Sequence, residues 1–234
     1  IKENEYTMVK MIAYCRTPEE YDLFDYRTLR PKYFVEKIDE TGKIDLSGVH
    51  FISQEVDDIK IKKDTLEYYT PNNFGILLSI TNQSLTKAKE IFDNLTLLNK
   101  QAIGDKNENL KKISIVTYDF IEAFQTSIVF SYTALEAFAN LSIPNDYEYK
   151  QKNKSKGTFE IFDKESIEKW LSLDVKLGDI LVEIYSSTPL KQKPLWTIFK
   201  RLEELRHDII HQKSISRAEF YKTYFNKDLL KECL

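Results

Sequence analysis

The sequence has few of the residues that build several common kinds of site. Its 234 residues include two cysteines, Cys15 and Cys233, which lie near opposite ends and form no Cys-x-x-Cys pair. This spacing favours neither a disulfide framework nor a thiolate zinc site, and it predicts a reducing compartment. Six glycines are present, none in the spacing of a phosphate-binding loop, and there is no Gly-x-Ser-x-Gly elbow. Chemistry that depends on either motif is therefore not expected.

Long apolar runs and a large net charge are also missing. The chain has no run of about 18 apolar residues and no signal-type segment, so we expect a soluble, cytoplasmic protein that does not contact membranes. The formal net charge is −3, from 34 basic and 37 acidic residues, so nucleic-acid binding would need a local basic cluster. The first residue is Ile1 rather than methionine, which we expect of a processed product or of a region taken from a longer protein.

Residues 1–80 have the pattern of a small β-rich module. Hydrophobic residues make up 42% of the chain, which is enough for a substantial core. Short alternating or apolar runs separated by turn residues predict strands, and they are Val9–Cys15, Tyr33–Val35, Val49–Ile52, Ile59–Ile61 and Phe74–Ile80. The module carries 11 basic and 15 acidic residues, so we do not expect it to grip RNA.

Residues 81–234 have helical periodicity instead. Apolar residues recur at three- and four-residue spacing over four stretches, which run from Ser84 to before Gly104, from Lys112 to Leu141, from Phe159 to Tyr185 as one or two shorter helices, and from Pro194 onward. Ser216 and Glu219 have capping-box spacing, which predicts a last helix. The expected fold is α+β and mainly α, with a β-rich module at 1–80 followed by a five- to six-helix bundle at 81–234.

The helix after Pro194 concentrates two of the three histidines beside an arginine. His207 and His211 are four residues apart, so on an ideal helix they project about 40° apart on one face. Arg206 and His211 are five residues apart and project about 140° apart. These two side chains converge only through the reach of the arginine, a distorted last turn, or a second copy of the helix. The spacing therefore favours a dimeric site.

The stretch Arg206-His-Asp-Ile-Ile-His211 resembles the signature motif of the HEPN superfamily, in which a histidine follows an arginine on a late helix of a helical bundle. The stretch Phe130–Asn140, with Glu136, is similar to the segment that precedes the motif in many such domains. In helix order the resemblance covers residues 84–232. It implies a HEPN-like bundle that acts as a metal-independent endoribonuclease without a cofactor. It also implies a homodimer, a role in toxin–antitoxin or anti-phage defence, and an antitoxin or regulatory protein as a further partner.

The side chains of this motif suit RNA cleavage by attack of the 2′-OH on the neighbouring phosphate. That reaction needs a group that moves protons near neutral pH and a fixed positive charge beside the phosphorane. We assign His211 as the general acid or base and Arg206 as the phosphate clamp. His207 is assigned as a polar residue that supports the site or contacts the substrate, and Glu136 as a residue that orients either partner.

Four lysines follow the long helix. Lys150, Lys152, Lys154 and Lys156 alternate with polar residues in a segment that has no apolar side chain, and it ends at Gly157. The pattern fits an exposed, solvated loop, and it also fits a loop that attracts RNA phosphates. Both interpretations remain open at this point.

Two other functions fit the same motif. A catalytically inactive relative would act as a scaffold or nucleotide-binding module, because fold resemblance does not fix function. A zinc hydrolase would use His207 and His211, which have the spacing of paired zinc ligands. Against zinc, Asp208 takes the place that the metalloprotease motif gives to glutamate, and only His50 remains as a third histidine. We therefore expect no metal.

Overall fold

The structure is a computed structural model that describes residues 10–15, 24–34, 51–101, 104–152, 157–211 and 217–226. The chain forms two compact units, Ile1–Ile76 and Leu77–Leu234, and the division falls inside the first helix rather than after residue 80. The described residues are mainly helical, with a small antiparallel sheet near the N-terminus. The expected α+β, mainly-α fold class is therefore confirmed.

The N-terminal unit is organised around one long strand. Strand β3 (Phe51–Ile61) pairs antiparallel with β1 (Lys10–Cys15), β2 (Lys32–Phe34) and β4 (Asp64–Tyr69). Strands β1 and β2 match the expected runs. Strand β3 joins two runs that we expected to be separate, and β4 was not predicted. Lys62 and Lys63 form the turn between β3 and β4. Lys62 adopts a positive φ of 58°, at a position where glycine or asparagine is usual.

The prediction of a strand over Phe74–Ile80 is wrong. These residues begin helix α1 (Asn73–Gln101), and the side chain of Asn72 accepts a hydrogen bond from the backbone N–H of Phe74 at 3.1 Å. Leu77 is buried, and so are Leu85 and Ala88 further along the same helix. The apolar run therefore belongs to a helical stripe, because a short apolar run by itself does not distinguish a strand from a buried helical turn.

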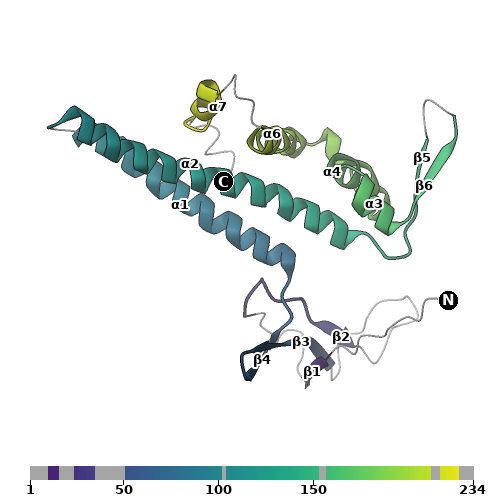
Figure 1. Cartoon of the computed structure of the whole chain (residues 1–234). Coiled ribbons are helices and arrows are strands. Elements are labelled where there is room, and N and C mark those ends of the chain that lie inside the picture. Colours follow the sequence, from purple (N-terminus) through teal and green to yellow (C-terminus); the bar gives the residue numbers. More distant parts are fainter. Residues whose placement is uncertain are drawn as a thin grey trace. The chain divides into compact units, whose positions relative to one another are not determined.

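Helix α2 (Lys106–Ser142) is the longest element and extends the expected helix at its N-terminal end. The carboxylate of Asp105 caps it by accepting a hydrogen bond from the N–H of Glu108 at 2.9 Å. Its apolar side chains pack with residues of α1, α6 and α7 in one core cluster, whose buried members are Leu85, Ala88, Phe120, Ala123, Phe124, Ile128 and Tyr224. Figure 1 shows α1 and α2 running antiparallel beneath α6 and α7.

Helix α2 is also long and apolar enough to cross a membrane by length and composition, and it is the one described helix that is. One such helix is weak evidence for a membrane span, because the core helix of a soluble protein passes the same test. The most apolar window of α2 is 28% buried, and the fully buried residues of this helix include Phe120 and Phe124. The structure is thus compatible with a soluble protein.

A β-hairpin follows α2, where we expected a loop and then a helix. Strands β5 (Tyr149–Lys152) and β6 (Phe159–Phe162) pair antiparallel. Strand β5, Tyr-Lys-Gln-Lys, lacks the hydrophobic pattern that usually predicts a strand, whereas β6, Phe-Glu-Ile-Phe, has it over only four residues. The expectation of an exposed loop from Lys150 and of helix from Phe159 is wrong for these residues.

Short helical elements then lead back across α2. They are α3 (Lys164–Trp170), α4 (Leu173–Val175), the π-helix η2 (Lys176–Ile180), α5 (Leu181–Ile184) and the 3-10 helix η3 (Leu190–Gln192). They form a second core cluster with the end of α2 and with Phe199. A Cβ atom on Gly178 would lie 2.3 Å from Cε of Lys191 and 2.9 Å from the Trp196 ring. Gly178 is therefore a site of close packing.

The π-helix contains a buried lysine. Lys176 has no exposed surface, and its Nζ donates a hydrogen bond to the carbonyl oxygen of Glu168 at 2.9 Å. Burial lowers the pKa of Lys176, while the charges of Glu136 and Glu168 act in the opposite direction. The Glu136 carboxylate on α2 lies 3.9 Å from this amine.

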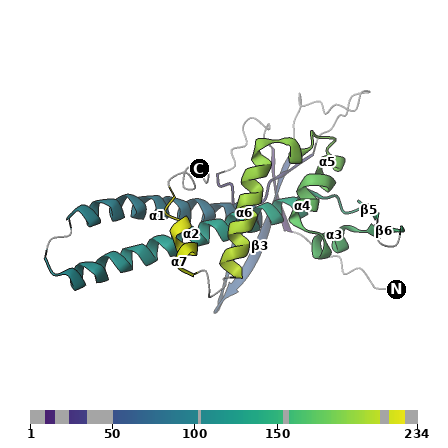
Figure 2. The same cartoon turned by 90° about the horizontal axis from the view of Figure 1, so that it is seen from above.

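The last two described helices are α6 (Pro194–Ile210) and α7 (Arg217–Thr223). Pro194 lies in the first turn of α6, where a missing N–H leaves no hydrogen bond unmade. Figure 2 shows α6 and α7 lying across α2. The expected helix after Pro194 is confirmed, and Glu219 lies in α7, but its expected capping partner Ser216 is outside the described residues.

Candidate active site

Motif residues Arg206 to Ile210 lie in the last two turns of α6, and His211 is the C-cap of this helix. Leu202, Leu205 and Ile209 are partly buried against the core cluster that joins α1, α2 and α7. This apolar stripe fixes the rotation of α6, because turning the helix would expose the stripe. As a result His207 and Asp208 are exposed and Arg206 is half-buried.

Arg206 lies against an aromatic ring of α2. The guanidinium carbon of Arg206 is 5.2 Å from the centroid of the Tyr132 ring, which is within the range of a cation–π interaction. In the part of the chain that the structure describes, no carboxylate lies within 4.0 Å of this guanidinium. The Tyr132 ring positions the guanidinium without neutralising its charge. The N–H groups of Arg206 can therefore bind an anion.

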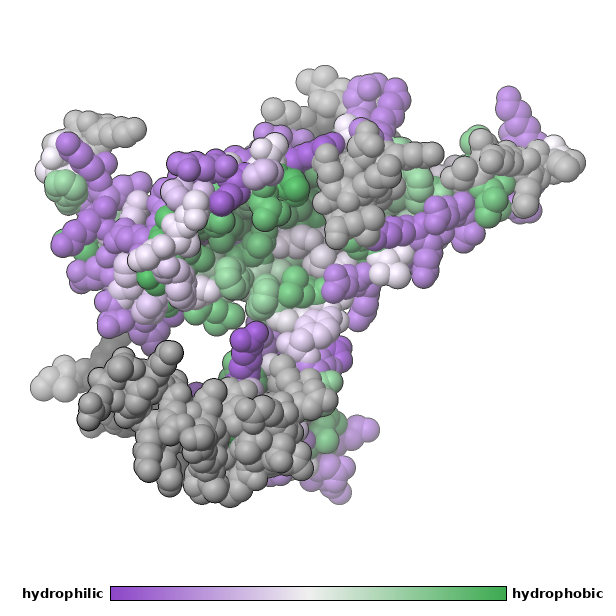
Figure 3. Space-filling view, turned by 180° about the vertical axis from the view of Figure 1, so that it is seen from behind, coloured by the Kyte–Doolittle hydropathy of each residue, from purple (hydrophilic) through white to green (hydrophobic). Residues whose placement is uncertain are grey.

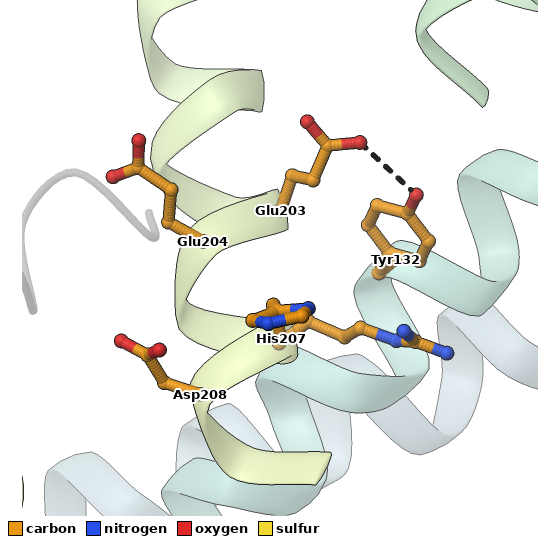
Figure 4. A pocket seen from close by; sticks show the side chains of 6 residues that line it. Tyr132, Glu203, Glu204, His207 and Asp208 are labelled. Carbon is orange, nitrogen blue, oxygen red and sulfur yellow. Dashed lines mark hydrogen bonds between the residues drawn. The ribbon is translucent and has the colours of Figure 1, made fainter. Parts of the chain in front are cut away.

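The Tyr132 ring is itself fixed by α6. Its hydroxyl group donates a hydrogen bond to Oε1 of Glu203 at 3.3 Å (Figure 4). Burial, together with the charge of Glu203, raises the pKa of the Tyr132 hydroxyl to about 12. The hydroxyl therefore stays protonated, and it stays a donor to Glu203, throughout the physiological pH range.

A chain of ion pairs holds Glu203 in turn. The amine of Lys200 contacts the other oxygen of Glu203, and it lies 3.0 Å from Oδ2 of Asp174. Lys191 links Asp174, at 3.6 Å, with Asp179, at 2.8 Å. Glu203 is thus held by both Tyr132 and Lys200. This series of ion pairs connects α6 with α4, through Asp174, and with η2, through Asp179.

The two histidines are close to each other and exposed. Their ring centroids are 4.7 Å apart with an interplanar angle of 44°, and the backbone N–H of His211 donates to the carbonyl of His207 at 2.9 Å. His211 ends the helix with φ −115° and ψ 38°. The structure brings His207 and His211 together, as their spacing predicted. It shows no contact between Arg206 and His211 within the described chain.

An open pocket of about 600 Å³ lies over this part of α6. Its lining residues are Tyr132, Glu203, Glu204, Arg206, His207 and Asp208. In Figure 4 Glu204 and Asp208 project on the side of α6 away from Tyr132, and His207 lies between the two sides. Of the four predicted catalytic residues, Arg206 and His207 line the pocket, whereas His211 and Glu136 do not.

Glu136 lies one helical turn after Tyr132 on α2, with its side chain 45% exposed. It forms the ion pair with Lys176, and its charge contributes to the raised pKa of Tyr132. The structure shows no direct contact of Glu136 with Arg206 or His211.

The four predicted RNA-binding lysines are only partly described. Lys150 and Lys152 are exposed on β5. Lys154 and Lys156 lie outside the described residues. The described pair belongs to the β5–β6 hairpin, a different element from the pocket on α6.

A metal centre gains no support from the described residues. Among them, no group of three or more histidine, cysteine or acidic side chains is placed to hold a metal ion. The third histidine of the zinc interpretation, His50, lies outside the described residues.

The chain was compared with protein-family models, with curated proteins and with solved structures. None matches.

Sequence reasoning missed Tyr132 and Glu203. Tyr132 lies within the stretch Phe130–Asn140, one turn before Glu136, so helical spacing alone places both on one face of α2. That spacing was a usable signal. The contact of Tyr132 with Arg206 joins two helices that are distant in sequence, and spacing within one helix does not reveal it.

Proposed function

We propose that the protein is a metal-independent endoribonuclease that cleaves RNA by attack of the 2′-OH on the neighbouring phosphate. The observation that carries the proposal is Arg206, whose guanidinium lies over the Tyr132 ring at an open pocket that His207 also lines. A scissile phosphate bound by this guanidinium would have the imidazole of His207 on the next residue of α6, and the ring of His211 lies 4.7 Å from that of His207. A fixed cation and a group that titrates near pH 7 are the two requirements of the reaction.

The roles in the proposed reaction are as follows. Arg206 binds the phosphate and stabilises the negative charge that develops on the phosphorane. His211 moves the proton, as general base for the 2′-OH or as general acid for the leaving 5′-oxygen. His207 contacts the substrate beside it. Glu136 acts on the site through Tyr132.

We place the reaction in a homodimer. Arg206 and His211 of one chain make no contact among the described residues, and their five-residue spacing projects them about 140° apart on an ideal helix, so a second copy of α6 would supply the missing partner to each pocket. Apolar side chains that a second copy would bury include Leu141 on α2 and Leu195 and Ile198 on α6, which are 66%, 69% and 43% exposed. Figure 3 shows an apolar area in the middle of one face of the helical unit.

We propose a cytoplasmic setting in toxin–antitoxin or anti-phage defence, with an antitoxin or regulatory protein as a further partner.

The products of the reaction test this proposal. Internal attack by the 2′-OH leaves a 2′,3′-cyclic phosphate, whereas attack by a metal-activated water does not. We expect cleavage of total RNA to persist in EDTA and to give cyclic-phosphate ends, detected by end-specific ligation. DNA, and RNA with 2′-O-methyl groups, should resist cleavage. Cleavage of the methylated RNA would contradict the mechanism, and loss of activity in EDTA would favour the zinc alternative.

Substitutions at Tyr132 test how Arg206 is held. Tyr132→Phe keeps the ring under the guanidinium and removes the hydrogen bond to Glu203, so we expect cleavage within about threefold of wild type. Tyr132→Ala removes both, and we expect roughly a 5- to 30-fold higher KM for RNA, the range of a lost cation–π contact. Equal effects of the two substitutions on KM would contradict the stacking role. Thermal unfolding of both variants provides the control for a loss of packing.

A further inference from the structure

The β5–β6 hairpin presents two different faces. In its register Lys150 pairs with Ile161 and Lys152 pairs with Phe159. Directly paired residues project to the same side of a sheet, and so do residues two apart along a strand. These four side chains therefore share one face, which we call the outer face of the hairpin. All four are exposed, Phe159 to 68% and Ile161 to 59%.

The opposite face anchors the hairpin. Tyr149, Gln151 and Phe162 are half-buried, and Tyr149 and Phe162 pack against the second core cluster. The hairpin extends from the helical unit next to α3 (Figures 1 and 2). One face thus fixes the hairpin to the bundle and leaves the outer face open to solvent.

Charge is segregated between the two faces. The outer face carries Lys150 and Lys152 and no acidic residue, whereas Glu160, the one acidic residue of the two strands, lies on the opposite face. Two residues of strand separate the lysines by roughly 6.8 Å, with an apolar side chain beside each. An exposed aromatic ring beside two cations is unusual on a solvated hairpin. The ring can stack on an accessible base, and the cations can bind the phosphates of a polyanion.

We propose that the outer face of the hairpin binds single-stranded RNA, with Phe159 stacking on a base and Lys150 and Lys152 contacting the flanking phosphates. The choice of RNA as ligand rests on the proposed function. Duplexes are disfavoured because their bases are already stacked and present no free face to Phe159. A membrane surface is disfavoured because interfacial binding requires a large buried apolar area. The outer face offers only two apolar side chains.

The stacking contact is tested with a ligand that the protein cannot cleave. A fluorescently labelled 2′-O-methyl oligouridine is titrated with the full chain, and its affinity is read by anisotropy. Phe159→Ala should weaken binding about 5- to 150-fold, the range expected for one stacked base. Phe159→Trp should retain the affinity. Tyr118→Ala is the matched control, because Tyr118 is an aromatic residue of α2 that is 65% exposed, and it should leave the affinity unchanged.

The phosphate contacts are tested by salt dependence. Lys150→Gln combined with Lys152→Gln should lower the slope of log affinity against log salt by about 1.4, because each single-strand phosphate contact contributes about 0.7. Lys111→Gln with Lys112→Gln removes the same charge from exposed positions of α2, and the slope should not change.

Three results would overturn this assignment. They are an unchanged affinity in Phe159→Ala, a preference of the wild type for duplex RNA, and Phe159-dependent binding to phosphatidylserine vesicles without binding to the oligonucleotide. The assay measures binding alone, so it separates the two proposals. Phe159-dependent binding by a chain that cleaves no RNA would end the nuclease proposal and retain the RNA-binding face.

Discussion

Replacing His211 with alanine is expected to lower the rate of RNA cleavage by roughly 10²- to 10⁴-fold, the contribution of proton transfer by a positioned side chain. Arg206→Ala should also abolish most of the cleavage, because it removes the cation that offsets charge on the phosphorane. The fold should survive both changes. His211 is exposed and ends its helix, and Arg206 lies outside the apolar stripe of α6. Circular dichroism and single-turnover cleavage of one RNA measure the two effects.

Mixing the two variants tests whether each site is shared between protomers. If Arg206 of one chain works with His211 of the other, a heterodimer of Arg206→Ala and His211→Ala contains one intact site of two. After subunit exchange, a random mixture should recover about a quarter of wild-type activity. A mixture as inactive as either variant alone would contradict the shared site. Full activity of His211→Ala alone would remove His211 from the mechanism, whereas a wild type that cleaves no RNA would favour an inactive scaffold or nucleotide-binding module.

Phe124→Ala should destabilise the helical unit by about 3–5 kcal/mol, the range for removing a fully buried aromatic side chain. Phe124 has no exposed surface, stacks on Phe120 at 5.7 Å and meets the edge of Tyr224 at 5.3 Å. The substitution leaves a cavity where α2 meets α7. Urea denaturation followed by circular dichroism gives the change in the free energy of unfolding.

The matched control is again an aromatic residue of α2. Tyr118→Ala removes a side chain that is 65% exposed, so it should change the free energy of unfolding by less than about 0.5 kcal/mol. Similar losses in both variants would mean that helix α2 does not pack as described.

Helix periodicity predicted the elements that position the site better than the elements around it. α2 and α6 carry long apolar stripes, and Pro194 marks the start of α6, so both helices were expected near their observed positions. Phe74–Ile80 was misassigned because a short apolar run suits either a strand or a buried helical turn. The β5–β6 hairpin was missed because its strands have four residues each.

In the candidate site too, contacts within one helix could be predicted from the sequence, whereas contacts between helices could not. The proximity of His207 and His211 follows from their four-residue spacing within one helix. The stacking of Arg206 on Tyr132 and the ion pair of Glu136 with Lys176 depend on how α6 and η2 pack on α2. Tertiary packing decides such contacts, and the spacing of residues within one element carries no information about them.

The burial of Lys176 has a kinetic consequence. An amine without exposed surface is closed to acylating reagents in the folded state, whereas the exposed lysines of the chain react freely. Acylation of Lys176 must therefore wait until the π-helix opens, and when opening is followed by fast labelling, the labelling rate equals the opening rate. The acylation rate of Lys176 therefore reports the rate at which the π-helix opens beside Glu136 of α2, which pairs with this lysine.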